Sequence, residues 1–184
     1  MRKLILMRKL IEITQVGLGG TIDPLDWAFP YLDEDHVTYA TKMLLEADAV
    51  LLGRRTYEGL SAAYSNMPPD PFVNRMNSIP KYVASGTLRD ATWNATVIDN
   101  DVVNFVTTLK SQPGNDILKY GNGPFSAALM THNLIDEFHL LLTPVAVGKG
   151  RHLFEDVDGA PALDLVSTRR FASGVLALVY APRI

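Results

Sequence analysis

The chain has 184 residues, of which 47% are hydrophobic, enough to bury the core of one domain of ordinary size. Its formal net charge of −3 excludes a chain-wide positive field that would bind nucleic acid or an anionic membrane. It has no cysteine and its four histidines lack paired ligand spacing. We therefore expect no disulfide, no thiolate nucleophile and no metal site.

The N-terminus contains the sequence MRKLI twice, at Met1–Ile5 and again at Met7–Ile11. We interpret residues 1–6 as an N-terminal extension or alternative start, and residues 7–184 as a single domain. The apolar stretches are interrupted by Arg8 and Lys9, and no small-residue cleavage site follows them. This pattern predicts neither a signal peptide nor a membrane span, so we expect a cytoplasmic protein.

The first predicted strand, Lys9–Val16, ends in the glycine-rich segment Gly17–Gly20. A loop then runs to the aromatic residues Trp27 and Phe29. A flexible loop that ends in aromatic residues is typical of a lid over a pocket. The alternative is that these aromatic side chains pack on the core.

A helix is predicted from Asp33-Glu34-Asp35 to about Ala47, because acidic residues in the first turn precede apolar residues at helical spacing. A carboxylate at this position usually caps the helix. Capping is therefore one interpretation of Asp33.

The stretch Ala49–Gly59, AVLLGRRTYEG, joins a short apolar run to a charged helix start. The apolar run predicts a buried strand, and Gly53 allows the backbone to approach a ligand closely. Arg54, Arg55 and Thr56 then open a helix whose free N–H groups favour an anion. The pattern predicts a phosphate site, and the alternative is a surface helix start with two solvated arginines.

The remaining chain alternates between predicted helices and strands and closes with a hairpin. Gly121-Asn122-Gly123 forms a second strand–glycine–helix junction, like the one at Gly53. Lys149 and Arg151 lie in a loop that either is solvated or holds an acidic substrate. This order predicts an α/β fold with a mostly parallel sheet and an antiparallel C-terminal hairpin. The predicted elements are helix Asp70–Asn77, strand Pro80–Ser85, strand Asn94–Ile98, helix Val102–Ser111, strand Asp116–Tyr120, helix Phe125–His132, strand Glu137–Pro144, and the hairpin strands Leu163–Phe171 and Val175–Ala181.

The segment GRRTYE at 53–58 resembles the G-R-x-T-x-E segment of dihydrofolate reductases. The stretches ADAVLLGRRTYEG and DPFVNRMNSIPKYVAS are similar to the reductase domain of bacterial riboflavin biosynthesis and its stand-alone relatives. The resemblance extends over nearly the whole chain from Met7. It implies a dihydrofolate reductase-like three-layer αβα fold, NADPH as the cofactor, and a homodimer.

The resemblance also implies roles for individual residues. It implies that Asp33 is a catalytic residue that contacts a polar substrate ring, as an acidic residue does in dihydrofolate reductase, and that Trp27, Phe29 and Tyr57 bind substrate. Two positions depart from the relatives: Gly19 replaces an acid, and Gly86 stands where a lysine or arginine is common. The implied cofactor-binding residues are Ile22, Gly53, Arg54, Arg55, Thr56, Ser85, Thr87, Gly121, Asn122, Gly123 and Phe125.

Our leading hypothesis is an NADPH-dependent reductase of a small heterocyclic or carbonyl-type substrate, with a pterin-like or pyrimidine-like ring as one form. In such enzymes the cofactor supplies the hydride and the protein supplies binding and orientation. The alternative is a nucleotide- or small-ligand-binding homodimer of the same fold without turnover. A third hypothesis is an apolar dimerisation module that binds no ligand.

Overall fold

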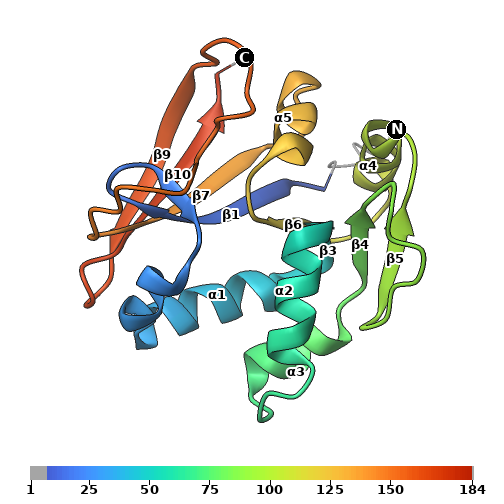
Figure 1. Ribbon diagram of the computed structural model, residues 1–184. Coiled ribbons are helices and arrows are strands. Elements are labelled where there is room, and N and C mark those ends of the chain that lie inside the picture. Colours follow the sequence, from blue (N-terminus) through green and yellow to red (C-terminus); the bar gives the residue numbers. More distant parts are fainter. Residues whose placement is uncertain (1–7, 184) are drawn as a thin grey trace, which may run out of the picture.

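A computed structural model describes residues 8–183, so the predicted extension at residues 1–6 lies outside the described part. The chain forms an eight-stranded sheet with helices on both faces, and a separate two-stranded sheet (Figure 1). The strands are β1 (Leu10–Gly17), β2 (Thr21–Asp23), β3 (Ala47–Gly53), β4 (Lys81–Ala84), β5 (Ala95–Ile98), β6 (Asp116–Tyr120), β7 (Glu137–Thr143), β8 (Arg151–His152), β9 (Leu163–Arg170) and β10 (Leu176–Pro182). The helices are η1 (Asp26–Tyr31), α1 (Glu34–Glu46), α2 (Arg54–Tyr64), α3 (Pro71–Ser78), α4 (Val102–Ser111) and α5 (Pro124–Thr131).

The strand order in the large sheet is β5-β4-β3-β6-β1-β7-β10-β9. The first six strands in this order, from β5 to β7, all pair in parallel with their neighbours. Strand β10 runs antiparallel to both β7 and β9. The prediction of a mostly parallel sheet with an antiparallel C-terminal part is therefore confirmed.

Two apolar clusters lie on opposite faces of this sheet, because successive side chains of a strand point to opposite sides. On β1, Ile11 and Ile13 belong to one cluster, together with buried residues of α1, α2 and α3. Leu10 and Val16 belong to the other cluster, with residues of α4 and α5. Figure 1 shows α1–α3 below the sheet and α4 and α5 above it. The predicted three-layer αβα architecture is thus confirmed.

The three central strands end at the same edge of the sheet. Strands β3, β6 and β1 are parallel neighbours, and their last residues lead into Gly53, Gly121 and the Gly17–Gly20 turn. In open parallel sheets this carboxyl edge is where ligands bind. Helices α2 and α5 begin at the same edge, so the glycine junctions found in the sequence lie side by side.

The small sheet pairs β2 with β8 and was not predicted from the sequence. It links the loop after β1 to the segment after β7. Strands of three and two residues are too short to show an alternating pattern, so the sequence carried no signal for them.

Lys81 is buried beside an aromatic ring of the cluster that contains Ile11 and Ile13. This placement should make the stability of the fold depend on pH. Its Nζ lies 4.2 Å from the Trp93 ring centroid and donates to the Ile79 carbonyl oxygen at 2.9 Å. Burial, helped by the Arg75 cation, lowers the pKa of Lys81 to about 8.

We predict that Lys81→Met flattens the rise in stability between pH 7.5 and 9.5. The folded-state pKa is below that of the unfolded chain, so the wild type gains stability as pH rises from the folded pKa toward the unfolded pKa. The difference in unfolding free energy between wild type and variant should change by about 1–2 kcal/mol over this range. Urea titrations at both pH values measure it, and a constant difference would contradict the prediction.

Candidate functional site

The helices that begin at the carboxyl edge are started differently from the others. Helices α1, α3 and α4 each begin after an aspartate, Asp33, Asp70 or Asp101, whose carboxylate accepts a hydrogen bond from an N–H of the first turn. Helices α2 and α5 begin after Gly53 and Gly123 and have no side-chain cap. The first-turn N–H groups of α2 and α5 therefore keep the capacity to bind an anion.

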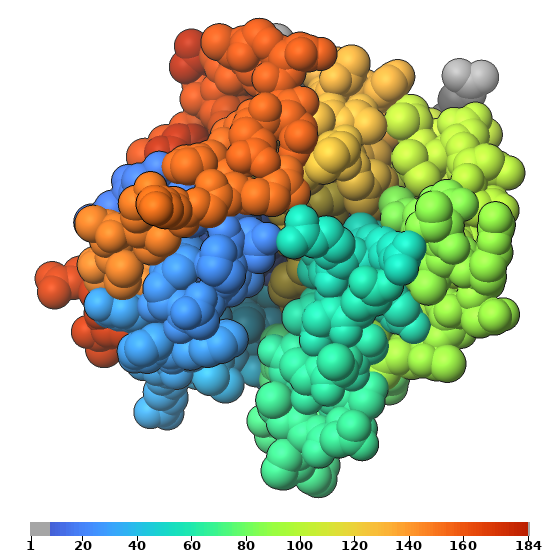
Figure 2. All heavy atoms as spheres, in the orientation of Figure 1, coloured from blue at the N-terminus to red at the C-terminus, as the bar shows by residue number. Residues whose placement is uncertain are grey.

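These two helix starts are in close contact. Gly121, between β6 and α5, has a φ of +77°, and a Cβ added there would lie 2.8 Å from the Thr56 Oγ1 of α2. Only glycine fits this conformation and this approach without strain. The surface is hollowed between the segment that contains η1 and helix α2 (Figure 2). This crevice opens beside the α2 start.

Arg54 connects α2 to the end of β4. Its guanidinium donates to Glu58 Oε1 and to Thr87 Oγ1, both at 2.7 Å. Ser85 Oγ accepts hydrogen bonds from the N–H groups of Thr87 and Leu88. The Arg54 side chain is 48% exposed, so a ligand can reach it. The structure thus brings together three of the residues implied to bind the cofactor, Arg54, Ser85 and Thr87.

The two glycines that depart from the relatives have different surroundings. Gly86 is exposed, and no atom of residues 8–183 lies within 4 Å of the position that a Cβ would take. A longer side chain would fit there. At Gly19, a Cβ would lie 3.1 Å from the Val147 carbonyl oxygen, so a larger residue would need a small shift of the loop.

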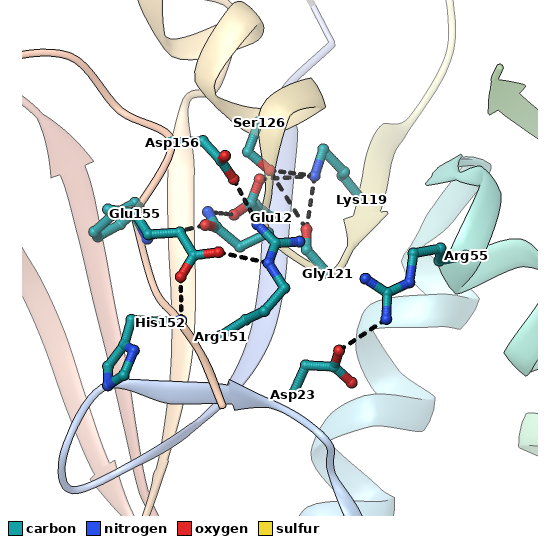
Figure 3. Close-up of polar contacts among 12 residues, drawn as sticks. Glu12, Asp23, Arg55, Lys119, Gly121, Ser126, Arg151, His152, Glu155 and Asp156 are labelled. Carbon is teal, nitrogen blue, oxygen red and sulfur yellow. Dashed lines mark hydrogen bonds and ion pairs between the residues drawn. The ribbon is translucent and has the colours of Figure 1, made fainter. Parts of the chain in front are cut away.

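Arg55 points across the crevice towards the small sheet. Its Nη2 lies 3.2 Å from Asp23 Oδ2, and the two side chains are 77% and 46% exposed. This pair joins the start of α2 to β2 (Figure 3). An exposed ion pair contributes little to stability, so an incoming anion can compete for Arg55 at low cost.

Arg151 lies beside the start of α5 because β8 pairs with β2. A Cβ added at Gly123 would lie 3.3 Å from Arg151 Nη1. The guanidinium donates to Glu155 and Asp156 at 2.6 Å each (Figure 3). The sequence left two interpretations of Arg151, a solvated loop residue or a contact to an acidic substrate. In the structure its guanidinium is held by two carboxylates of the protein at the edge of the site.

A buried polar network lies beneath the Gly121 turn (Figure 3). Lys119 Nζ is 3.0 Å from Glu12 Oε2, and it also donates to the Gly121 carbonyl oxygen and to Ser126 Oγ. The Asn122 amide donates to Glu12 Oε1 at 2.7 Å. This network was not predicted from the sequence. A signal was present, because Glu12 and Lys119 each lie inside a mostly apolar strand, LIEITQVG or DILKY, which is an unusual position for a charged residue.

A second polar pair, also not predicted, lies at the end of β1. The Gln15 amide nitrogen is 3.1 Å from Nε2 of His36, in the first turn of α1. Burial lowers the pKa of His36 and favours the neutral imidazole. Gln15 Oε1 and Tyr120 Oη are buried without hydrogen-bond partners among the described residues. Ile13 pairs with Tyr120, so Gln15 and Tyr120 lie on the same face of neighbouring strands.

A comparison with models of protein families matches residues 26–177 to the RibD C-terminal domain. The chain belongs to the RibD C-terminal domain family. One relative, the uncharacterized protein YyaP of Bacillus subtilis (strain 168), is 33% identical over 182 residues, which is 94% of each chain.

Solved structures share the fold of this RibD C-terminal domain. Dihydrofolate reductase from Enterococcus faecalis, complexed with NADP(H) and RAB-propyl, gives a TM-score of 0.64 at 16% identity and covers 96% of this chain and 97% of that chain. A diaminohydroxyphosphoribosylaminopyrimidine deaminase/5-amino-6-(5-phosphoribosylamino)uracil reductase from Thermotoga maritima gives a TM-score of 0.68 at 13% identity, over 96% of this chain and 57% of that chain. The expected dihydrofolate reductase-like fold is therefore confirmed.

In this RibD C-terminal domain, Asp33 has the geometry of a helix cap. One carboxylate oxygen accepts from the His36 N–H at 2.9 Å, and the other accepts from the Ser173 N–H at 2.6 Å, in the β9–β10 turn. The His36 N–H lowers the pKa of Asp33, and the Ser173 N–H acts in the same direction. The capping interpretation is what the structure shows, and the catalytic role remains a prediction.

The aromatic residues predicted to bind substrate differ in their exposure. Phe29 is 65% exposed in η1, and the Trp27 indole nitrogen is buried without a partner among the described residues. Tyr57 is only 5% exposed, and its hydroxyl donates to the carbonyl of Thr92 and accepts from the N–H of the same residue. The inward face of α2 thus places Tyr57 in the core, and its role in substrate binding stays a prediction.

Two predicted cofactor residues lie at the borders of the site. Ile22 is buried in β2, and Phe125 lies in the first turn of α5, with its ring centroid 5.2 Å from Lys119 Nζ. Within residues 8–183, no group of three or more metal-ligating side chains is placed to hold an ion. No helix in this range is both long and apolar enough to cross a membrane.

We predict that Asp33→Ala lowers the melting temperature, because two backbone donors lose their acceptor. The pKa of Asp33 is lowered in the folded state, so this carboxylate stabilises the fold above its unfolded pKa. Its contribution is lost as pH falls through the folded pKa. Glu34→Ala, in the same helical turn, is the control and should have a smaller effect. Equal melting temperatures for Asp33→Ala and wild type at neutral pH would exclude the capping role.

Proposed function

We propose that the protein is an NADPH-dependent reductase of a small heterocyclic or carbonyl-type substrate. The observation that carries this proposal is the meeting of two uncapped helix starts, at Gly53 and Gly123, beside the half-exposed Arg54. The family supports it, since its name is that of a riboflavin-biosynthesis reductase domain and solved structures of the same fold include reductases. When bound, the nicotinamide supplies the hydride.

The residues at the carboxyl edge fit a dinucleotide phosphate. We assign the pyrophosphate to the first-turn N–H groups of α2, which include those of Arg55 and Thr56, to the Thr56 hydroxyl, and to the Gly121–Gly123 turn. Gly121 adds no side chain to this surface, and its backbone lies against the Thr56 hydroxyl. We assign the 2′-phosphate to Arg54, whose planar fork suits a phosphate, together with Ser85 and Thr87. Ile22 and Phe125 would border the cofactor.

We place the substrate in the crevice between η1 and α2. Three buried polar atoms that lack partners among the described residues, Trp27 Nε1, Gln15 Oε1 and Tyr120 Oη, suit a ring with hydrogen-bond donors and acceptors, such as a pterin or a pyrimidine. Phe29 would cover the substrate from η1. A direct role for Asp33 requires that its carboxylate contact the substrate in addition to its two backbone donors.

The alternative is a ligand-binding homodimer of the same fold without turnover. Gly19 and Gly86 favour it, because the family resemblance implies an acid and a cation at these two positions. Hydride transfer separates the two functions. Incubation with NADPH deuterated at the transferred position and a panel of pterins, aminopyrimidines and carbonyl compounds should yield a deuterated product. Cofactor binding without transfer to any acceptor would support the alternative.

We predict that Arg54→Ala weakens NADPH binding by roughly tenfold to a hundredfold, because a hydrogen bond to a charged group contributes about 1.5–3 kcal/mol. NADH lacks the 2′-phosphate, so its affinity should stay nearly constant and the preference for NADPH should disappear. Fluorescence titration with each cofactor measures both affinities.

Two further variants control for this result. Thr56→Ala acts at the pyrophosphate shared by both cofactors and should weaken NADPH and NADH alike. Gly86→Arg adds a cation where there is open space, so it should strengthen NADPH binding selectively. Unchanged NADPH affinity in Arg54→Ala would contradict the assignment of Arg54.

We also propose that the chain forms a homodimer through β9, the edge strand of the large sheet, where Leu165 and Val166 are 55% and 58% exposed. Sedimentation at micromolar concentration should show a dimer for the wild type and a monomer for Val166→Glu. Leu45→Glu, a comparably exposed apolar residue on α1, should remain dimeric. A wild-type chain that sediments as a monomer would contradict the proposal.

A further inference from the structure

The central strands carry an ion pair that is fully enclosed by protein. Glu12 on β1 and Lys119 on β6 are 0% and 2% exposed, and they face α5. Removing two charges from water is costly, and well-packed apolar residues would hold two strands together at least as well. A purely structural role therefore gives no reason for charges at this position.

The contacts of Lys119 converge on the turn where α5 begins. Its Nζ donates to the Gly121 carbonyl oxygen at 2.7 Å and to Ser126 Oγ at 2.5 Å, and it forms an ion pair with Glu12 Oε2 at 3.0 Å. Glu12 in turn holds the turn through Asn122. The side-chain oxygen of Asn122 accepts a hydrogen bond from the Phe154 N–H at 3.0 Å, so both ends of the Asn122 amide are held.

These contacts determine which way one peptide group faces. The Gly121–Asn122 peptide bond is trans, so its C=O and its N–H point in opposite directions. Because Lys119 draws the Gly121 C=O into the core, the Asn122 N–H must point away from the core. The start of α2 lies against this turn, since a Cβ added at Gly121 would be 2.8 Å from Thr56 Oγ1.

We propose that Glu12 and Lys119 are positioning residues that fix the Gly121–Asn122 peptide so that its N–H donates to the pyrophosphate of a nicotinamide dinucleotide. The identity of the ligand rests on the proposed function. Neither charged side chain touches the ligand, because both act through Gly121 and Asn122. The chain thus keeps a buried charged pair in order to present a neutral backbone donor in one orientation.

The double variant Glu12→Gln/Lys119→Met tests this proposal, since it removes both charges and leaves neither one buried alone. We expect it to unfold cooperatively. Its crystal structure should show the Gly121 C=O released from the core, and its affinities for NADPH and NADH should fall together by roughly tenfold. A structural role alone would change stability but not the binding of both cofactors in parallel.

The matched control is Lys110→Met. Lys110 is another buried lysine, which donates to the Leu134 carbonyl oxygen and pairs with Asp136 away from the turn. This variant should lose stability while binding both cofactors with wild-type affinity. If the double variant does not fold, Asn122→Ala removes the side-chain anchor and leaves the ion pair, and it should weaken both cofactors alike.

Two results would overturn the proposal: a double variant in which the Gly121 C=O keeps its inward orientation, or wild-type affinity for both cofactors in the variant that folds. Failure of the proposed function looks different, because the wild type itself would then bind neither NADPH nor NADH. In that case the orientation of the peptide in the variant still decides whether the pair positions the turn.

Discussion

The candidate site depends on the parallel pairing of β3, β6 and β1, because only parallel neighbours bring their carboxyl ends to one edge of a sheet. Two of these ends lead through a glycine turn into a helix, so two positive helix termini meet there. Gly121 must be a glycine, because its φ is positive and Thr56 lies against it. The sheet thus positions backbone donors more rigidly than side chains of loops could.

Charge is distributed at this edge in a way that suits an exchangeable anion. The chain has a net charge of −3, yet three arginines, Arg54, Arg55 and Arg151, surround the two helix starts. Arg54 and Arg151 pair with carboxylates four or five residues further along the chain, and Arg55 pairs with Asp23 of β2. These pairs hold the guanidinium groups in place without a ligand, and their partial exposure lets a phosphate compete for them. Beneath them, the Glu12–Lys119 pair is enclosed and cannot be exchanged in this way.

Much of the fold could be predicted because its signals are local. The run from Ala49 to Thr56 predicted a strand, a glycine and a helix start, and the structure has all three. The other α/β junctions follow from the same short patterns. The family resemblance also predicted a common role for Arg54, Ser85 and Thr87, which are distant in the sequence and lie together in the structure.

The rest could not be predicted because it depends on contacts between distant segments. Pairing of Glu12 with Lys119 becomes visible only when β1 and β6 are known to be neighbours. Tertiary packing also determines which side of α2 faces the core and so buries Tyr57. It likewise brings the Ser173 N–H to the Asp33 carboxylate. A charged residue inside an apolar strand indicates that a buried polar contact exists, but the sequence does not identify the partner residue.

The central claim, that the carboxyl edge of the sheet binds a nicotinamide dinucleotide, is tested most directly by a crystal structure of the protein with NADPH. The account predicts pyrophosphate density between the start of α2 and the Gly121–Gly123 turn. It also predicts the 2′-phosphate within hydrogen-bond distance of Arg54. Cofactor density elsewhere on the protein, or an empty edge at saturating NADPH, would contradict it.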